Sequence, residues 1–299
     1  MNKLEKIGND HVSGAMDITI RCAEYLRERA QRFSGEEPDQ FVLHLTTIGD
    51  QLKEAQPAMA PVHHAVQSIL TPVKKSFKDG LDVQHLKEAT DSAAQNFIDK
   101  MKLSLKHLAE FGFTLIESGQ KIMTYSSSRA VSEILKKAKK EGKTFRVIVP
   151  ESRPMLEGRI LAQDLGSSGI QCTMIIDGAI SIFLDAADIV LVGADRVSET
   201  YAVNKVGTFA LARMAFDMHL PVYCACETSK FLHSDLLPFI QNEMPSEEVW
   251  EKSPENVIIK NLYFEKILLD SFTGFITERG ILGAEKVRNL ISNSPFSED

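Results

Sequence analysis

Several features that would point this sequence to other classes of protein are scarce or missing. The chain of 299 residues has four cysteines and one tryptophan, and no unbroken apolar run is long enough to span a bilayer. The N-terminal stretch is charged and lacks the apolar segment of a secretory signal. A formal net charge of -7 is the opposite of what a broad phosphate-backbone interface needs. We therefore expect a cytoplasmic globular protein that binds neither membrane nor nucleic acid.

The few cysteines also argue against a disulfide framework and against a metal centre. Two of them form the sequence "CAC", which would put Cys224 and Cys226 on one face of a strand. A second pair of ligands is missing, so we expect buried, reduced thiols and no metal site. The other two cysteines, Cys22 and Cys172, stand alone in the sequence.

The spacing of apolar residues in the sequence changes near residue 118. Residues 1–118 are predicted to form a helical domain, in which one apolar stripe recurs at helical spacing. From residue 119 to residue 299 short apolar runs alternate with amphipathic helices, which is typical of a Rossmann-like α/β domain with a mostly parallel, doubly wound sheet. The stripe consists of Leu86, Ala89, Ala93, Phe97, Met101, Leu105 and Leu108. The predicted strands are "KIMTY", "TFRVIV", "CTMII", "DIVLVG", "PVYCAC" and "FTGFIT".

Polar residues follow several of these strands, at the sheet edge where open α/β proteins bind ligands. Arg153 lies ahead of a proline and a predicted helix, where its guanidinium could bind a phosphate; the simpler alternative is an ion pair with a glutamate. Asp195 follows an apolar strand, where partial burial could raise its pKa and make it an acid or base. Asn204 and Lys205 are expected to open the next helix and to meet its N-terminal amides at one anion. The alternative there is a helix cap and a solvated lysine.

Taken together, these clusters resemble one family. The segments "ESRPMLEGR", "GADRVSETYAVNKVGT" and "ACETSKF" are similar to the superfamily of methylthioribose-1-phosphate isomerase, ribose-1,5-bisphosphate isomerase and the alpha, beta and delta subunits of translation initiation factor 2B. The resemblance implies a helical domain, a Rossmann-like domain, a sugar-phosphate site between them, and a homodimer or higher homo-oligomer. It also implies that Asp195 acts in proton transfer between C2 and C1, and that Arg153, Asn204 and Lys205 bind substrate.

Two positions depart from the isomerase pattern. The resemblance implies a cysteine at the position of Ser126, whereas the initiation factor's alpha subunits lack it and share the ending formed by Ser128 and Arg129. A thiol can be tuned to a thiolate, but a serine hydroxyl cannot ionise without an adjacent base. The isomerases also carry an arginine for the phosphate where this chain has Gln56, a loss of about 1.5 to 3 kcal/mol of charge-assisted bonding.

Three functions follow from these matches and departures. The first is a protein like the initiation factor 2B alpha subunit that binds a pentose phosphate or a nucleoside monophosphate, without catalysis or with altered chemistry, as Ser126 and Gln56 suggest. The alternative is an aldose–ketose isomerase of ribose 1,5-bisphosphate or a similar pentose 1-phosphate, with Asp195 as acid and base. A third possibility is an enzyme of altered substrate that uses Tyr125 or Glu227. None of the three requires a metal or a dissociable cofactor, because proton transfer in a polar site needs none.

Overall fold

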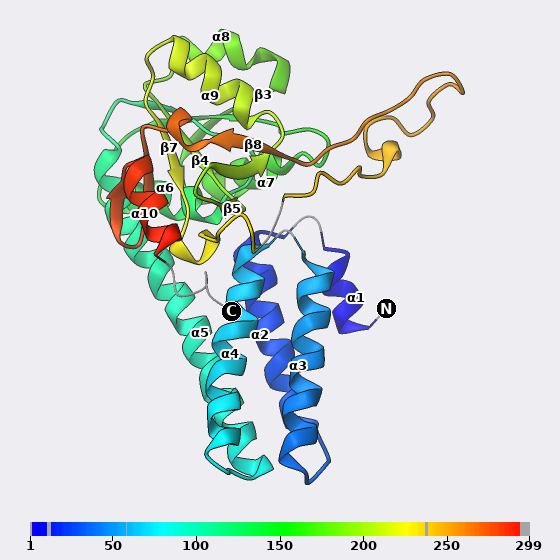
Figure 1. Ribbon diagram of the computed structural model, residues 1–299. Helices are drawn as coiled ribbons and strands as arrows, with labels where there is room; N and C mark the ends of the chain where they lie inside the picture. Colours follow the sequence, from blue (N-terminus) through cyan, green and yellow to red (C-terminus); the bar gives the residue numbers. More distant parts are fainter. Residues whose placement is uncertain (1, 11–12, 58, 237–238, 294–299) are drawn as a thin grey trace. The chain divides into compact units, whose positions relative to one another are not determined.

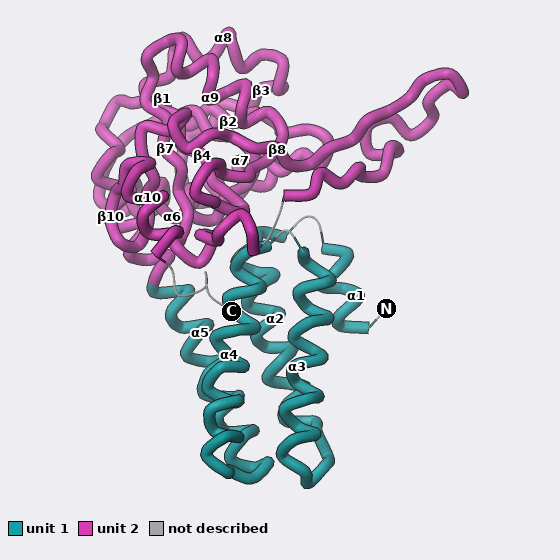
Figure 2. The backbone as a smooth tube through the Cα atoms, in the orientation of Figure 1, with its two compact units in different colours: residues 1–103 teal, residues 104–299 magenta. Residues whose placement is uncertain are grey.

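The chain divides into two compact units, residues 1–103 and 104–299 (Figures 1 and 2). A computed structural model describes residues 2–10, 13–57, 59–236 and 239–293. The division falls inside the long helix α5 (Val83–Gly112), and a domain boundary at residue 118 remains a prediction. Within the described residues no helix is both long enough and apolar enough to cross a membrane.

Unit 1 is helical, as the sequence predicts. It contains α1 (Lys3–Gly8), α2 (Ala15–Gln31), α3 (Pro38–Ala55), α4 (Ala60–Lys78) and the first part of α5. Prolines stand in the first turns of α3 and α4, where the missing N–H has no intrahelical partner to lose. Helices α2, α3 and α4 pack against one another and bury fully apolar side chains, among them Leu26, Phe41, Leu45 and Ile69.

The apolar stripe predicted for residues 86–108 lies on α5. Its larger members are buried, namely Leu86, Phe97, Met101, Leu105 and Leu108. The helix ends at Gly112 and is followed by a 3-10 turn, η1 (Phe113–Leu115). The first residues of the glycine-containing stretch "FGFTLIESGQ" thus end the helix, as expected from the loss of the period.

Unit 2 is built on the mostly parallel sheet that the apolar runs predict. Its strand order is β10-β9-β7-β4-β1-β2-β3, and every neighbouring pair is parallel except β10 with β9. The strands are β1 (Lys121–Met123), β2 (Arg146–Pro150), β3 (Gln171–Ile175), β4 (Ile189–Gly193), β7 (Val222–Ala225), β9 (Gly274–Thr277) and β10 (Gly280–Leu282).

The direction of strand addition reverses between β1 and β4. The chain lays β2 and β3 on one side of β1 and then returns to place β4 on the other side. Ligands of doubly wound sheets bind beyond the carboxyl ends of the strands at such a reversal. The connecting helices are α6 (Arg129–Lys140), α7 (Glu157–Ser167), α8 (Ile180–Leu184) and α9 (Thr208–Asp217), and α10 (Ala284–Ser292) follows β10.

A second sheet was not predicted from the sequence. It is antiparallel, with strand order β5-β6-β8, and consists of β5 (Arg196–Val197), β6 (Tyr201–Lys205) and β8 (Phe264–Leu268). The prediction that Asn204 and Lys205 open a helix is therefore wrong, because both end β6 and α9 begins at Thr208. Pairing with β8, some sixty residues along the chain, holds these two residues in extended backbone.

Short 3-10 turns complete unit 2. They are η2 (Asp177–Ala179), η3 (Thr228–Lys230), η4 (Ser246–Glu248) and η5 (Leu269–Ser271). The connection that contains η4 extends away from the sheets (Figure 1), and Trp250 on it is 51% exposed. This agrees with the surface excursion expected for the proline- and glutamate-containing stretch around it.

Candidate functional site

Asp195 lies just beyond the carboxyl end of β4, at the reversal point of the sheet. Its backbone N–H donates to the carbonyl of Val203, so the small sheet fixes its position. Burial raises the pKa of the Asp195 carboxyl above the ordinary aspartate value, and the charge of Glu157 adds to the rise. The charges of Lys230 and Lys205 act in the opposite direction. A carboxyl group held in this way keeps its proton to a higher pH than an ordinary aspartate does.

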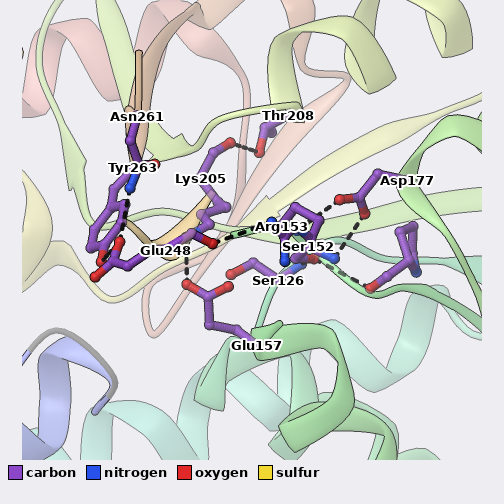
Figure 3. Close-up of polar contacts among 11 residues, drawn as sticks. Ser126, Ser152, Arg153, Glu157, Asp177, Lys205, Thr208, Glu248, Asn261 and Tyr263 are labelled. Carbon is purple, nitrogen blue, oxygen red and sulfur yellow. Dashed lines mark hydrogen bonds and ion pairs between the residues drawn. The ribbon is translucent and has the colours of Figure 1, made fainter. Parts of the chain in front are cut away.

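Lys205 is buried beside Asp195 and forms an ion pair with Glu157. The Nζ of Lys205 lies 2.6 Å from Oε1 of Glu157, and the same Nζ lies 4.5 Å from the centre of the Tyr263 ring. Figure 3 shows the Lys205 side chain reaching from β6 to the start of α7. The other carboxylate oxygen, Oε2 of Glu157, is buried and has no hydrogen-bond partner among the described residues.

A second ammonium, on Lys230, lies near Asp195 and pairs with a second glutamate. Lys230 donates from Nζ to the carbonyl of Ala194 at 2.7 Å and lies 3.7 Å from Oε2 of Glu227. Burial lowers the pKa of Lys230, but the charges of Glu227 and Asp195 outweigh this and raise it. We use the name Asp195 cluster for Asp195, Glu157, Lys205, Glu227 and Lys230.

The amides at the start of α9 do not join this cluster. Oε1 of Glu265 accepts hydrogen bonds from the N–H groups of Gly207 and Phe209 at 2.7 and 2.8 Å. The side-chain amide of Asn204 donates to the hydroxyl of Thr208 at 3.0 Å. The ammonium, the amide and the helix N-terminus that were expected to converge on one anion thus each have a partner inside the protein. The helix N-terminus is thus capped by a carboxylate, and the binding of a substrate by Asn204 and Lys205 remains a prediction.

The carboxyl end of β1 leads into a tight turn. Ser126 has a φ of 62°, and its N–H donates to Oγ of Ser152 at 2.8 Å. Ser128 caps α6, since its Oγ accepts from the N–H of Val131. Gly193 at the end of β4 faces Ser128, because an added Cβ would lie 2.5 Å from Oγ of Ser128. The ends of β1 and β4 therefore adjoin, which puts Ser126 and Ser128 at the reversal point.

Asp177 holds the neighbouring turn after β2. Its two carboxylate oxygens accept from the backbone N–H groups of Ser152 and Arg153, each at 2.7 Å, as Figure 3 shows. Its side chain caps neither the 3-10 turn that it begins nor α8. The Asp177 carboxylate therefore holds the turn from which Arg153 projects.

Arg153 is exposed and contacts the excursion that carries η4. Its guanidinium donates to the carbonyls of Glu248 and Val249 at 3.2 and 3.0 Å and, among the described residues, forms no ion pair with a glutamate carboxylate. The Glu248 carboxylate accepts from the hydroxyl of Tyr263 at 2.6 Å and from the amide of Asn261 at 2.8 Å. Arg153 and Tyr263 thus fasten η4 from two sides (Figure 3). The predicted role of Arg153 in phosphate binding remains a prediction.

Gln56 lies in unit 1, whereas the other predicted site residues lie in unit 2. It ends α3 as the C-cap residue, and its side-chain amide donates to the carbonyl of Ile7 at 2.7 Å. Gln56 is buried. Within its own unit it therefore joins α1 to α3, and its contact with a substrate remains a prediction.

Sequence reasoning missed Glu157, Tyr263 and Glu248. Glu157 is part of the quoted motif "ESRPMLEGR", and a carboxylate in the first turn of a helix that follows a parallel strand is the signal that could have singled it out. Tyr263 and Glu248 come from an irregular segment without a hydrophobic period, so its sequence pattern does not single out either residue. No group of three or more metal-ligating side chains occurs in the part of the chain that the structure describes.

Comparison with known proteins now gives this fold and site a context. The initiation factor 2 subunit family matches residues 11–284. The chain belongs to this family. A ribose 1,5-bisphosphate isomerase of Thermococcus kodakarensis is 31% identical over 93% of this chain and 89% of its own length. A putative translation initiation factor eIF-2B subunit 2-like protein of Pyrococcus furiosus is 30% identical over 93% of this chain and 94% of its length.

Solved structures agree with this assignment. The translation initiation factor eIF-2B of Pyrococcus horikoshii is 29% identical, with a TM-score of 0.80 over 94% of this chain and 95% of that chain. A 5-methylthioribose 1-phosphate isomerase from the same organism, 22% identical, has a TM-score of 0.81 over 96% of this chain and 85% of that chain. The resemblance predicted from the strand-end motifs is confirmed, and so is the fold.

Proposed function

We propose that this family member is an aldose–ketose isomerase that converts ribose 1,5-bisphosphate, or a similar pentose 1-phosphate, into the ketose. Relatives about 30% identical over most of both chains carry the name ribose 1,5-bisphosphate isomerase. Their names favour this function over the non-catalytic one suggested by Ser126. The ligand is accordingly a phosphorylated pentose that binds beyond the ends of β1 and β4.

The charge balance of the Asp195 cluster is the observation that carries the proposal. The cluster has three carboxyl groups, on Asp195, Glu157 and Glu227, and two ammonium groups, on Lys205 and Lys230. Its charges cancel when one carboxyl group holds a proton, and the raised pKa of Asp195 marks it as that group. A protonated carboxyl beside a substrate can donate to an oxygen and take the proton back, as isomerisation requires.

The isomerisation itself needs only a rearrangement of atoms already in the sugar. The bond from C1 to the ring oxygen breaks, and that oxygen gains a proton. C2 loses its hydrogen and C1 gains one, while the C2 hydroxyl loses its proton to become the carbonyl. Asp195 is suited to the exchange between the two oxygens, because a single carboxyl group can give a proton to one and later receive a proton from the other.

A binding protein of the initiation-factor kind is the second candidate, and Ser126 favours it. The resemblance predicts a cysteine at this position in isomerases, and a serine in the turn after β1 cannot supply a thiolate. In that case the site would hold a pentose phosphate or a nucleoside monophosphate and release it unchanged. For both candidate functions we propose a cytoplasmic protein that assembles into a homodimer or higher homo-oligomer.

A phosphorus NMR time course of the purified protein with ribose 1,5-bisphosphate in deuterated water separates the two. Appearance of the ketose bisphosphate supports the isomerase, with Asp195→Asn as the inactive control. Substrate signals that broaden or shift without conversion support the binding protein. Running ribose 5-phosphate and a nucleoside monophosphate in parallel tells which phosphorylated group the site requires.

A further inference from the structure

Glu157 is the group in the Asp195 cluster whose hydrogen bonding is incomplete. The residue is 8% exposed, and Lys205 binds one of its oxygens at 2.6 Å. Its other oxygen, Oε2, has no hydrogen-bond partner among the described residues. Buried polar atoms are almost always bonded, so such an exception calls for a ligand or a catalytic role. The charge of Glu157 also acts on the carboxyl group of Asp195, so the two are electrostatic neighbours.

We propose that Oε2 of Glu157 is the base that moves the proton between C2 and C1, in the role the resemblance assigns to a cysteine. The inference rests on the proposed isomerase function and names its missing catalytic residue. Lys205 fixes the carboxylate through Oε1, and Oε2 keeps its lone pairs unpaired among the described residues. A carboxylate base beside a second group that protonates oxygen is a known solution for aldose–ketose isomerisation.

The reaction balances with these two groups alone. Oε2 of Glu157 takes the C2 proton, and the C–H electron pair forms a double bond to C1. The pair of the C1–oxygen bond goes to the ring oxygen, which takes the proton of Asp195. The enol hydroxyl on C2 then returns a proton to Asp195 as the carbonyl forms, and the double-bond pair takes the proton from Glu157 at C1. Both side chains end as they began.

Other candidates near the reversal point are poorly suited to this step. Burial, with the charge of Asp177, raises the pKa of the Tyr125 phenol, which disfavours a phenolate. The hydrogen bond with Cys224, followed by burial, raises the pKa of the Cys226 thiol. The hydroxyl of Ser126 does not ionise without an adjacent base. Glu157 is therefore the group that combines a carboxylate held by Lys205, an oxygen without a partner among the described residues and a place beside Asp195.

The test compares kcat for ribose 1,5-bisphosphate in the wild type, Glu157→Gln and Asp164→Asn, with ketose bisphosphate affinity measured in parallel. Glu157→Gln keeps the shape and an acceptor for Lys205, and kcat should fall by about 10²- to 10⁴-fold while the dissociation constant changes by less than about tenfold. Asp164, on the same helix α7, forms an ion pair with Lys136 at 2.7 Å outside the Asp195 cluster. Its variant should keep kcat within about twofold, because it takes no part in the reaction.

A second variant tests the chemistry independently of shape. Glu157→Ala should be inactive and should recover activity in proportion to added formate, whose carboxylate can occupy the vacated space. If Glu157→Gln does not fold, this rescue decides the matter. A Glu157→Gln enzyme within tenfold of wild type, or a folded Glu157→Ala enzyme that formate leaves inactive, overturns the role of Glu157 while the isomerase function stands. A wild type that converts no pentose phosphate overturns both.

Discussion

Two carboxylates at neighbouring strand ends, Asp177 after β3 and Glu157 after β2, have opposite surroundings. Both oxygens of Asp177 accept backbone N–H groups at 2.7 Å. Glu157 has one oxygen bonded to Lys205 and one without a partner among the described residues. The first arrangement holds a turn in place and leaves nothing for a ligand. The second leaves a buried acceptor without a partner, which costs stability and is the observation behind the role proposed for Glu157.

The largest expected effect comes from Gly158, which brings Glu157 against β2. An added Cβ would lie 1.9 Å from the carbonyl oxygen of Pro150, a backbone atom that cannot move aside. Gly158→Ala should therefore lower the free energy of unfolding by about 3 kcal/mol or more, measured by urea denaturation. Gly166, on the same helix, has nothing within 4 Å of an added Cβ, and Gly166→Ala should be neutral or slightly stabilising. Equal effects for the two variants would mean that α7 does not rest tightly on β2.

Removing the Asp177 side chain should have the next largest effect. Asp177→Ala leaves the N–H groups of Ser152 and Arg153 without their acceptor, and charge-assisted bonds of this kind contribute about 1.5 to 3 kcal/mol. We expect a loss of about 2 kcal/mol in unfolding free energy, whereas alanine at the exposed Asp185 should change it by less than about 0.5 kcal/mol. A loss of pentose-phosphate binding with full stability would instead show that Asp177 belongs with Glu157 as a functional carboxylate.

Local sequence predicts the large sheet and the position of Asp195. The six apolar runs predict strands of the parallel sheet, because residues buried on both faces need no alternation. Asp195 follows from the same pattern, since a polar residue directly after such a run must lie at the sheet edge. These inferences use local sequence only, and the structure has Asp195 at the predicted place, just after β4.

The small sheet could not be predicted in this way. Strand β5 has two residues, and β6 ends in Asn204 and Lys205, whose polar side chains resemble a helix start. Their extended backbone comes from pairing with β8, a contact that no local pattern encodes. The same pairing places Lys205 within reach of Glu157, so the ion pair depends on a long-range contact and cannot be predicted from local sequence.

The ionisation of Asp195 gives a smaller, pH-dependent effect. Because burial raises its pKa in the folded protein, ionisation favours the unfolded chain. The contribution of Asp195 to stability should be fully present below the ordinary aspartate pKa of about 3.9. It should be lost as the pH rises through the raised pKa of Asp195 in the folded protein. Asp195→Asn lacks this loss, so its stability relative to wild type should increase with pH. The gain is about 1.4 kcal/mol for each pKa unit by which the two states differ.

Urea denaturation of both proteins between pH 4 and pH 8 measures this difference, and a gap that stays constant or shrinks with pH would contradict it. When Asp195→Asn is made in the Glu157→Gln variant, its stability relative to Glu157→Gln alone should increase less with pH. The charge of Glu157 contributes to the raised pKa of Asp195, so its removal lowers that pKa. A smaller increase would show that the two carboxylates are electrostatically coupled.

The smallest effect is expected at Tyr263, which contacts the ion pair and the η4 excursion with different parts of its side chain. Tyr263→Phe removes the hydroxyl that donates to Glu248 at 2.6 Å and keeps the ring 4.5 Å from Nζ of Lys205. The loss should be about 1 kcal/mol by urea denaturation, and Tyr223→Phe in β7 serves as the control. Since the ring stays beside Lys205, we expect kcat of Tyr263→Phe to equal that of the wild type. A fall in kcat would mean that the Tyr263 hydroxyl links η4 to Lys205 and, through Lys205, positions the carboxylate of Glu157.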